Sequence, residues 1–220
     1  MDNNRWPVRA DFPIAQPGLK FIILTILITG MLFYFGWMVF ACLFTGLTLF
    51  ITWFFRDPDR TPPLEVDAMT APADGKVIDI DRLPDCDYLD GTCIKISIFM
   101  NVFNVHVNRI PFDGEIEQVL YHPGKFMNAS FDKASTHNER NVLVIKTANN
   151  YRFAVVQIAG LIARRIVNCA KAGDVFKKGD RYGMIQFGSR LDLYLPEEFS
   201  VSVKKGQKTT AGSTVIGYLK

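Results

Sequence analysis

The hydrophobic pattern divides the chain into one uninterrupted apolar run and a longer remainder of short alternating segments. The run covers residues 19–55, is dominated by Phe, Ile, Leu, Val, Met and Trp, and contains no charge after Lys20. A membrane-spanning helix needs about 20 apolar residues, so this run is nearly long enough for two. Gly36 lies near its middle and permits a tight turn. The pattern predicts a membrane anchor: a helical hairpin, one long tilted span, or a monotopic interfacial anchor.

Basic residues flank both ends of this run, including Arg56 and Arg60 after it. Because positive charge prefers the cytoplasmic side of a membrane, a hairpin with both ends inside satisfies both flanks. We therefore expect residues 1–18 to form an N-terminal cytoplasmic segment and residues 19–55 the anchor. Residues 56–220 are expected to form a domain on the cytoplasmic face of the inner membrane.

The remainder of the chain is typical of β-structure. Its apolar segments are short, rich in β-branched residues, and bounded by Gly, Pro or Asn-Asn. Apart from residues 162–169, where a helix is an alternative, helical periodicity is missing. The pattern predicts a mainly β domain, shaped as a sandwich or barrel, after an N-terminal transmembrane helical segment. The expected strands are residues 77–80, 93–99, 102–107, 114–121, 141–147, 152–158 and 191–195.

A weak internal repeat suggests a more specific arrangement. Residues 173–180 and 203–217 both carry Lys-Lys-Gly, in which the glycine permits a left-handed turn between short strands. Such hairpins resemble those of biotinyl and lipoyl carrier domains. They motivate a rival hypothesis, a non-enzymatic adaptor domain tethered to the membrane. The Met-Lys-Met type of modification hairpin is absent, however, and a shared fold does not imply a shared function.

Composition narrows the function classes. The formal net charge is +3, and no basic block with interleaved aromatics indicates a nucleic-acid partner. Four cysteines are scattered without a CxxC pair, and a cytoplasmic domain keeps its thiols reduced, so we expect neither disulfides nor a metal site. Several basic residues form either a solvated face or a surface attracted to anionic lipid headgroups. These are Lys177, Lys178, Arg181, Lys204, Lys205 and Lys208.

Four short segments together resemble the short-form phosphatidylserine decarboxylases. In chain order they are Phe55–Arg60 (FRDPDR), Ala71–Val77 (APADGKV), Asn101–Arg109 (NVFNVHVNR) and Phe187–Arg190 (FGSR). The resemblance covers roughly residues 55–200. It implies that the chain cuts itself between Gly188 and Ser189 and converts the serine into a covalent pyruvoyl group, with no metal. The large chain 1–188 and the small chain 189–220 are then expected to stay together as a heterodimer.

The residues at this bond suit such chemistry. The hydroxyl of Ser189 can attack the preceding carbonyl, and Gly188 leaves that carbonyl unobstructed. A second Gly-Ser pair, Gly212-Ser213, is similar to the cleavage motif of longer family members. Cutting there would leave a fragment too short to be held by its own packing, so Gly188-Ser189 is the predicted site.

Two further residues are candidates for proton transfer. Alternation along a strand would place His106 on a polar face with Asn104 and Asn108, where a neutral imidazole can act as a base. The resemblance implies that Asp74 belongs to an Asp-His-Ser relay for self-cleavage.

Two other positions, Arg109 and His122, bear on the family pattern. Longer members carry a second histidine three residues after the first, whereas this chain has Arg109, so the base for self-cleavage stays open. His122 is a reserve candidate for substrate binding.

The resemblance implies a reaction as well. A phosphatidylserine decarboxylase converts phosphatidylserine in the membrane to phosphatidylethanolamine and carbon dioxide, through a Schiff base between the headgroup amine and the pyruvoyl carbonyl. An archaetidylserine-type phospholipid is an alternative substrate. A serine hydrolase built from Ser189, His106 and Asp74 is a weaker hypothesis, because the chain lacks Gly-x-Ser-x-Gly and a strand–turn–helix elbow.

Overall fold

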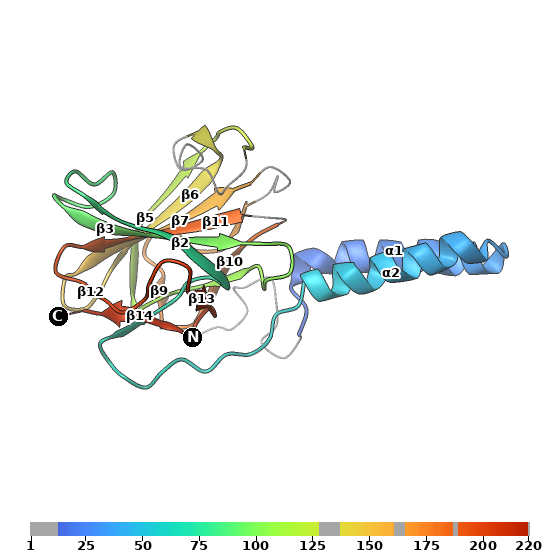
Figure 1. Ribbon diagram of the computed structural model, residues 1–220, viewed down its shortest axis with the longest axis horizontal. Coiled ribbons are helices and arrows are strands. Elements are labelled where there is room, and N and C mark those ends of the chain that lie inside the picture. The colour runs from blue at the N-terminus through green and yellow to red at the C-terminus, as the bar shows by residue number, and fades with distance from the viewer. Residues whose placement is uncertain (1–12, 128–136, 161–165, 187–188, 220) are drawn as a thin grey trace. The chain divides into compact units, whose positions relative to one another are not determined.

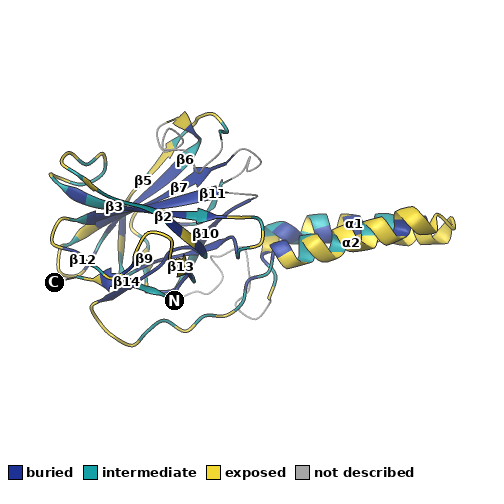
Figure 2. Cartoon of the chain, viewed as in Figure 1, coloured by how far each residue is buried: buried dark blue, intermediate teal, exposed yellow. Residues whose placement is uncertain are grey.

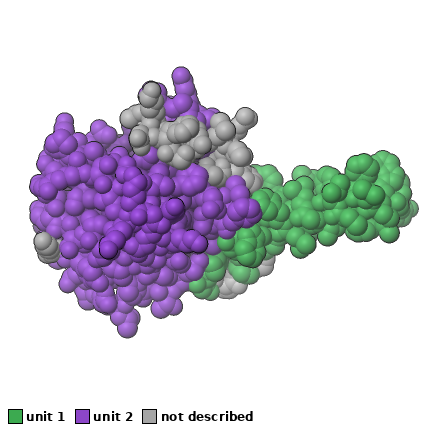
Figure 3. All heavy atoms as spheres, viewed as in Figure 1, with its two compact units in different colours: residues 1–59 green, residues 60–220 purple. Residues whose placement is uncertain are grey.

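The computed structural model describes residues 13–127, 137–160, 166–186 and 189–219, and these parts are mainly β-structure. The chain divides into two compact units, Met1–Asp59 and Arg60–Lys220, which Figure 3 distinguishes by colour. The first unit is helical and the second contains all the described strands.

The first unit is a helical hairpin. Helix α1 (Gln16–Tyr34) and helix α2 (Met38–Phe54) are joined at Gly36, whose φ of 73° is a left-handed conformation that favours glycine. Within the described residues, α1 is the one helix long and apolar enough to cross a membrane, while α2 is apolar but shorter. Most of the large apolar side chains of both helices are exposed, as the yellow ribbon in Figure 2 shows.

The two ends of the hairpin are tied together. The amide of Ala15 donates to the carbonyl of Phe55 over 2.7 Å, and the amide of Asp57 donates to the carbonyl of Pro13 over 2.7 Å. Gly18 allows this close approach, because a Cβ atom there would lie 2.2 Å from the Phe55 ring. The chain therefore leaves the hairpin beside the point where it entered.

The second unit is built on an eight-stranded sheet, and every pairing between its described strands is antiparallel (Figure 1). The sheet order is β13-β2-β3-β11-β7-β6-β5-β9, and the sheet curls into a half-barrel. Two three-stranded sheets, β1-β14-β12 and β4-β10-β8, complete the unit. The strands are β1 (Ala68–Thr70), β2 (Gly75–Leu83), β3 (Cys93–Met100), β4 (Val107–Arg109), β5 (Gly114–His122), β6 (Arg140–Lys146), β7 (Arg152–Ala159), β8 (Ile166–Asn168), β9 (Val175–Phe176), β10 (Arg181–Ile185), β11 (Ser189–Pro196), β12 (Ser200–Val201), β13 (Lys208–Thr209) and β14 (Val215–Tyr218).

The large sheet is buried on both faces at its centre. Along β11, Leu191, Leu193 and Leu195 point into the main hydrophobic core, which we call the inner face. Tyr194 points to the opposite, outer face, where a smaller cluster is covered by residues 83–89. The Tyr88 ring packs edge-on against Tyr194 with centroids 4.9 Å apart. Strands β6, β7 and β11 are accordingly dark blue for most of their length in Figure 2.

Most of the strand predictions are confirmed, and one is wrong. Residues 102–106 form a turn and an irregular stretch before the short β4, because the Asn101 side chain accepts the Phe103 amide and the Asn104 side chain accepts the Asn101 amide. A helix was the alternative at residues 162–169; its described part contains strand β8, and residues 162–165 lie outside the described residues.

The Lys-Lys-Gly turns have the expected conformation, with φ of 88° at Gly179 and 91° at Gly206. The architecture around them is a curled eight-stranded sheet, and the likeness to biotinyl and lipoyl hairpins is not confirmed beyond these turns.

Candidate active site

Ser189 is the first residue of β11 and is completely buried. It pairs with Met100 of β3 on one side and with Ala159 of β7 on the other. Its side chain faces inward with Leu191, since residues two apart on a strand share a face. Its Oγ atom has no hydrogen-bond partner among the described residues. A buried hydroxyl without a partner costs stability, so a function is the natural explanation for it. Its predicted partner in cleavage, Gly188, lies outside the described residues.

His106 is also completely buried and lies just before β4. Its carbonyl accepts the amide of Ile185, the last residue of β10, over 3.4 Å. Because β10 leads within a few residues to Ser189, the structure brings His106 to the chain segment that enters the predicted cleavage site. The Nδ1 atom of His106 lies 2.9 Å from the carbonyl oxygen of Asn104. A carbonyl can only accept, so in the neutral ring Nδ1 carries the proton and Nε2 is the basic nitrogen.

Asp74 immediately precedes β2 and is held on two sides. Its Oδ1 accepts the amide of Ala211 over 2.7 Å, and its Oδ2 lies 3.2 Å from Nη2 of Arg60. The carboxylate is therefore fixed by a residue of the FRDPDR segment and by the turn that leads to Ser213.

The register of the large sheet relates Asp74 to Ser189. Lys76 of β2 pairs with Phe99 of β3, and Phe99 pairs with Arg190 of β11. Neighbouring strands lie about 4.8 Å apart, so the backbones of β2 and β11 are roughly 10 Å apart here. Both strands begin at this end of the sheet. Three of the four family-like segments thus reach one end of the sheet, and Arg60 of the fourth reaches it through Asp74.

His122 lies elsewhere. It pairs with Arg140, Arg140 with Ile158, and Ile158 with Arg190, so three strand spacings, about 14 Å, separate it from β11. Directly paired residues share a face, and Arg190 faces outward while Ser189 faces inward. The structure does not bring His122 to the face that carries Ser189.

Arg109, which stands where longer relatives have a second histidine, is buried and structural in its contacts. Its Nη1 atom donates to the carbonyl of Gly179 over 2.9 Å. Its guanidinium is always protonated and cannot serve as a base. Two of the cysteines, Cys93 and Cys169, are poor candidates for nucleophiles, because burial raises the pKa of each thiol to about 12.

The residues beside Ser189 include a buried ion pair that the sequence reasoning missed. Arg190 is bound to Asp192 through Nε, 2.5 Å from Oδ1, and through Nη2, 3.0 Å from Oδ2. The same Nη2 lies 2.8 Å from Oγ of Ser97 on β3. The sequence does contain a signal for this ion pair, because Arg190 and Asp192 carry opposite charges and residues two apart in a strand share a face. The pair fixes the strand immediately after the predicted cut.

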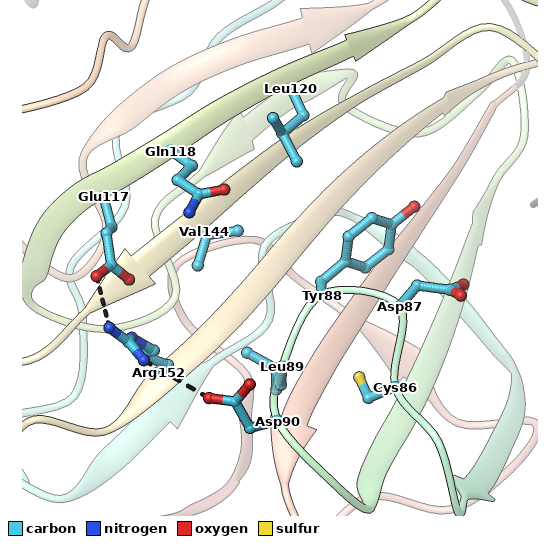
Figure 4. Close-up of a pocket in the computed structure, with 10 residues that line it drawn as sticks. All are labelled: Cys86, Asp87, Tyr88, Leu89, Asp90, Glu117, Gln118, Leu120, Val144 and Arg152. Carbon is cyan, nitrogen blue, oxygen red and sulfur yellow. Dashed lines mark hydrogen bonds and ion pairs between the residues drawn. The ribbon is translucent and has the colours of Figure 1, made fainter.

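A hollow of about 360 Å³ on the outer face is separate from this site (Figure 4). Figure 4 shows Tyr88 and Leu89 on one side of it and Glu117 and Arg152 on the other. Arg152 begins β7 and Ala159 ends it, so at about 3.3 Å per residue the hollow lies roughly 20 Å along the strand from Ser189. No groups of acidic, histidine and cysteine residues in the described part of the chain could hold a metal ion.

Comparison with known proteins identifies the family. The family profile described as phosphatidylserine decarboxylase matches residues 47–217. The phosphatidylserine decarboxylase proenzyme of Pelobacter propionicus is 49% identical over 220 residues, which is 100% of both chains. The proenzyme of the same name from Solidesulfovibrio magneticus is 52% identical over 204 residues, 92% of this chain and 94% of its own. That from Syntrophotalea carbinolica is 47% identical over 208 residues, 94% of this chain and 97% of its own. The chain therefore belongs to the phosphatidylserine decarboxylase family, a family of lyases.

Proposed function

We propose that this protein is a membrane-anchored phosphatidylserine decarboxylase that matures by cutting its own chain between Gly188 and Ser189. The observation that carries the proposal is the buried, unpartnered hydroxyl of Ser189 at the start of β11, beside the segment contacted by His106. Family membership supplies the reaction: its relatives are named proenzymes, a name that fits maturation by cleavage.

The cleavage uses atoms of the chain and one water molecule. A base removes the hydroxyl proton of Ser189, Oγ bonds to the carbonyl carbon of Gly188, and the peptide C–N bond breaks to leave an ester and a free amine. Loss of the Cα proton and departure of the Gly188 carboxylate then give dehydroalanine. Water hydrolyses its imine tautomer, releasing ammonia and leaving a pyruvoyl group at residue 189. We assign the first proton transfer to Nε2 of His106.

The surroundings of Ser189 fit a small neutral ketone. Its cross-strand neighbours, Met100 and Ala159, are uncharged and completely buried. When present, a pyruvoyl group supplies an electrophilic carbonyl that binds an amine and takes up the electrons released with carbon dioxide. The protein contributes a buried site, which limits the access of bulk water, and a histidine to move protons.

We propose that Asp74 acts on the charge and orientation of the histidine and not on the reacting atoms. A carboxylate favours the charged form of a nearby histidine and can hold its orientation. Its bonds to Arg60 and to the Ala211 amide hold it at the reacting end of the sheet.

The strand order explains why the cut chain would stay together. The small chain, residues 189–220, contributes β11 between β3 and β7, at the centre of the eight-stranded sheet. It also contributes β13 to the sheet's edge and β12 and β14 to a second sheet. Separation would expose buried leucines and break the pairings of β11 with β3 and β7, of β13 with β2 and of β14 with β1, so the two chains are proposed to form a stable heterodimer.

The helical hairpin is proposed to hold the enzyme at its substrate. Helix α1 has 19 residues and is about 28 Å long, close to the thickness of about 30 Å of a bilayer's hydrocarbon core. A phospholipid headgroup stays at the interface, so an anchored enzyme needs no lipid extraction. We propose that residues 19–55 anchor the protein in the inner membrane and that residues 56–220 form the cytoplasmic catalytic domain.

Intact mass spectrometry of purified, active protein tests the proposal. Two chains, 1–188 and 189–220, are expected, the smaller beginning with a pyruvoyl group. Ser189→Ala is expected to remain uncut, folded and inactive, because alanine has no hydroxyl to form the ester.

Ser213→Ala is the matched control and is expected to be cut normally, although its turn contacts Asp74. An unbroken chain in active wild-type protein contradicts the mechanism. A Ser213 variant that stays whole would move the cut to Gly212-Ser213.

A further inference from the structure

Three buried side-chain amides form a continuous chain of hydrogen bonds on the inner face of the sheet. Nδ2 of Asn141 on β6 donates to Oε1 of Gln157 on β7 over 3.2 Å. Nε2 of Gln157 then donates to Oδ1 of Asn108 on β4 over 2.9 Å. Asn108 and Gln157 are completely buried, and Asn141 is 4% exposed. The chain ends where Nδ2 of Asn108 lies 3.7 Å from Sδ of Met100 on β3.

Each bond in this chain fixes the orientation of the next amide. Because the oxygen of Gln157 accepts from Asn141, its nitrogen must face Asn108. The oxygen of Asn108 then faces Gln157, and its nitrogen faces Met100. The three amides therefore have one consistent arrangement.

The middle bond joins two sheets. Gln157 belongs to the eight-stranded sheet, whereas Asn108 belongs to the three-stranded sheet β4-β10-β8. Gly183 of β10 makes room for this contact, since a Cβ atom there would lie 2.6 Å from Nε2 of Gln157. We call the bond between Gln157 and Asn108 the amide bridge.

Each end of the amide bridge lies within a few residues, or one strand pairing, of a residue of the proposed site. Asn108 follows His106 by two residues. Gln157 precedes Ala159 by two residues, and Ala159 pairs directly with Ser189. The strand that follows His106 and the strand that begins at Ser189 belong to different sheets. The position of His106 relative to Ser189 therefore depends on how those sheets are joined.

Apolar side chains at these positions would hold the two sheets together but would fix their relative register less strictly. Hydrophobic contact is non-directional, whereas a hydrogen bond weakens steeply when its angle or length changes. Buried amides are costly if left unpaired, so the bridge penalises any sliding of β4 along β7. A polar link in this position favours one register of the two sheets.

We propose that Asn108 and Gln157 are positioning residues that hold His106 in register with Ser189. The proposal rests on the proposed function, because it takes His106 and Ser189 as the reacting groups. It adds a role for two amides that do not bond to the Ser189 hydroxyl.

The test replaces both partners of the bridge together. Because Nδ2 of Asn141 loses its acceptor when Gln157 is replaced, the single variant Asn141→Leu is made alongside and measures what the loss of the third amide alone does to cleavage. The double variant Asn108→Leu with Gln157→Met is expected to fold but to cut itself ten- to a hundredfold more slowly, measured from the conversion of freshly synthesised precursor. On fully cut protein, kcat for decarboxylation is expected to fall at least tenfold while KM stays within twofold of wild type.

Two further variants separate positioning from general stability. The exchange variant, Asn108→Gln with Gln157→Asn, keeps both amides and is expected to recover at least part of the cleavage rate. Thr70→Val removes a buried hydroxyl bond of 3.2 Å to the Pro111 carbonyl; Thr70 lies on β1, outside the two sheets that the bridge joins, and this variant is expected to cut at the wild-type rate.

The outcomes also separate this proposal from the one on which it rests. If Ser189→Ala stays uncut while the apolar double variant cuts as fast as wild type, the bridge has no positioning role and the function stands. An exchange variant as slow as the apolar one, or a rise in KM with unchanged kcat, also overturns positioning. Wild-type protein that neither cuts itself nor decarboxylates phosphatidylserine overturns the function instead.

Discussion

The hydroxyl of Ser189 contributes nothing to folding that alanine would not. It is completely buried and has no partner among the described residues, a state that the buried hydroxyl of Tyr182 shares, whereas several other buried polar side chains are bonded. Thr209, for example, donates its hydroxyl to the Ala73 carbonyl over 3.0 Å. At the scale of single residues, the position of this unsatisfied group at the predicted cut is what makes it an indication of chemistry.

His106 is the proposed proton-transfer group, and its substitution is the direct test at this scale. His106→Ala is expected to lower the rate of decarboxylation by about 10² to 10⁴-fold, because positioned acid–base groups contribute about that much. The rate should be measured on fully cut protein, so that a maturation defect is not mistaken for a catalytic one.

His122→Ala is the matched control for that experiment. His122 faces the outer side of the sheet, three strands from β11, so its loss is expected to leave turnover within a few-fold of wild type. Near-normal turnover of His106→Ala, or an equal loss in both variants, would remove His106 from the site.

Single-residue predictions from the sequence depended on local motifs. Ser189, His106 and Asp74 could be proposed because each lies in a short segment with a recognisable pattern. The amides of Asn108 and Gln157 could not, since they are far apart in the chain and meet only through the packing of two sheets. His122 was proposed from a similar-looking segment, and only the strand register shows that it faces away.

At the scale of elements, alternation and β-branched residues predicted most strands of the large sheet, because one or both faces of each strand are buried. The exception at residues 102–107 has a local cause. Two asparagine side chains, Asn101 and Asn104, bond to nearby backbone amides and replace the ladder that a strand needs. This turn places His106 beside β10, so the failed prediction lies at the proposed site.

Gly75, in the Ala-Asp-Gly segment, lies where β2 and β3 pack closely, and its substitution tests whether the site needs that close packing. A Cβ atom at residue 75 would lie 2.4 Å from the carbonyl oxygen of Phe99, which is backbone and cannot move freely. Gly75→Ala is expected to destabilise the protein by about 1–3 kcal/mol, as overpacking does. It is also expected to slow self-cleavage, because displacing β2 displaces Asp74.

Gly173→Ala provides a control of similar stability cost. Gly173 has φ of 85° and open space around it, so alanine there costs about 1–2 kcal/mol through backbone strain alone. Thermal unfolding of the detergent-solubilised proteins and the rate of precursor conversion should be compared. Equal cleavage rates in the two variants would show that the packing of β2 against β3 does not affect the site.

At the scale of the whole molecule, the order of the strands in the large sheet differs from their order in the sequence. Strand β11 follows β10 in sequence but lies between β3 and β7, so the proposed cut precedes a strand at the centre of the sheet. Neither composition nor periodicity predicts this order, because antiparallel neighbours are chosen by packing of distant segments. The arrangement lets one covalent bond be lost without loss of the core.

The helical hairpin makes a prediction about membrane topology. Backbone hydrogen bonds join Ala15 to Phe55 and Pro13 to Asp57, so the chain enters and leaves the hairpin at the same end. Basic residues flank both sides of the apolar run, and positive charge prefers the cytoplasmic side. Reporter domains fused at residue 4 and at residue 220 are therefore both expected to read cytoplasmic.

The alternative topology gives a clear contrary result in the same experiment. A single tilted span would separate the hairpin's ends by the thickness of the bilayer, so the reporter at residue 4 would read external. That result would require the bonds between the two ends of the hairpin to be absent in the membrane. It would leave the decarboxylase assignment intact, because the site residues all belong to the unit Arg60–Lys220. Topology and chemistry are thus tested independently.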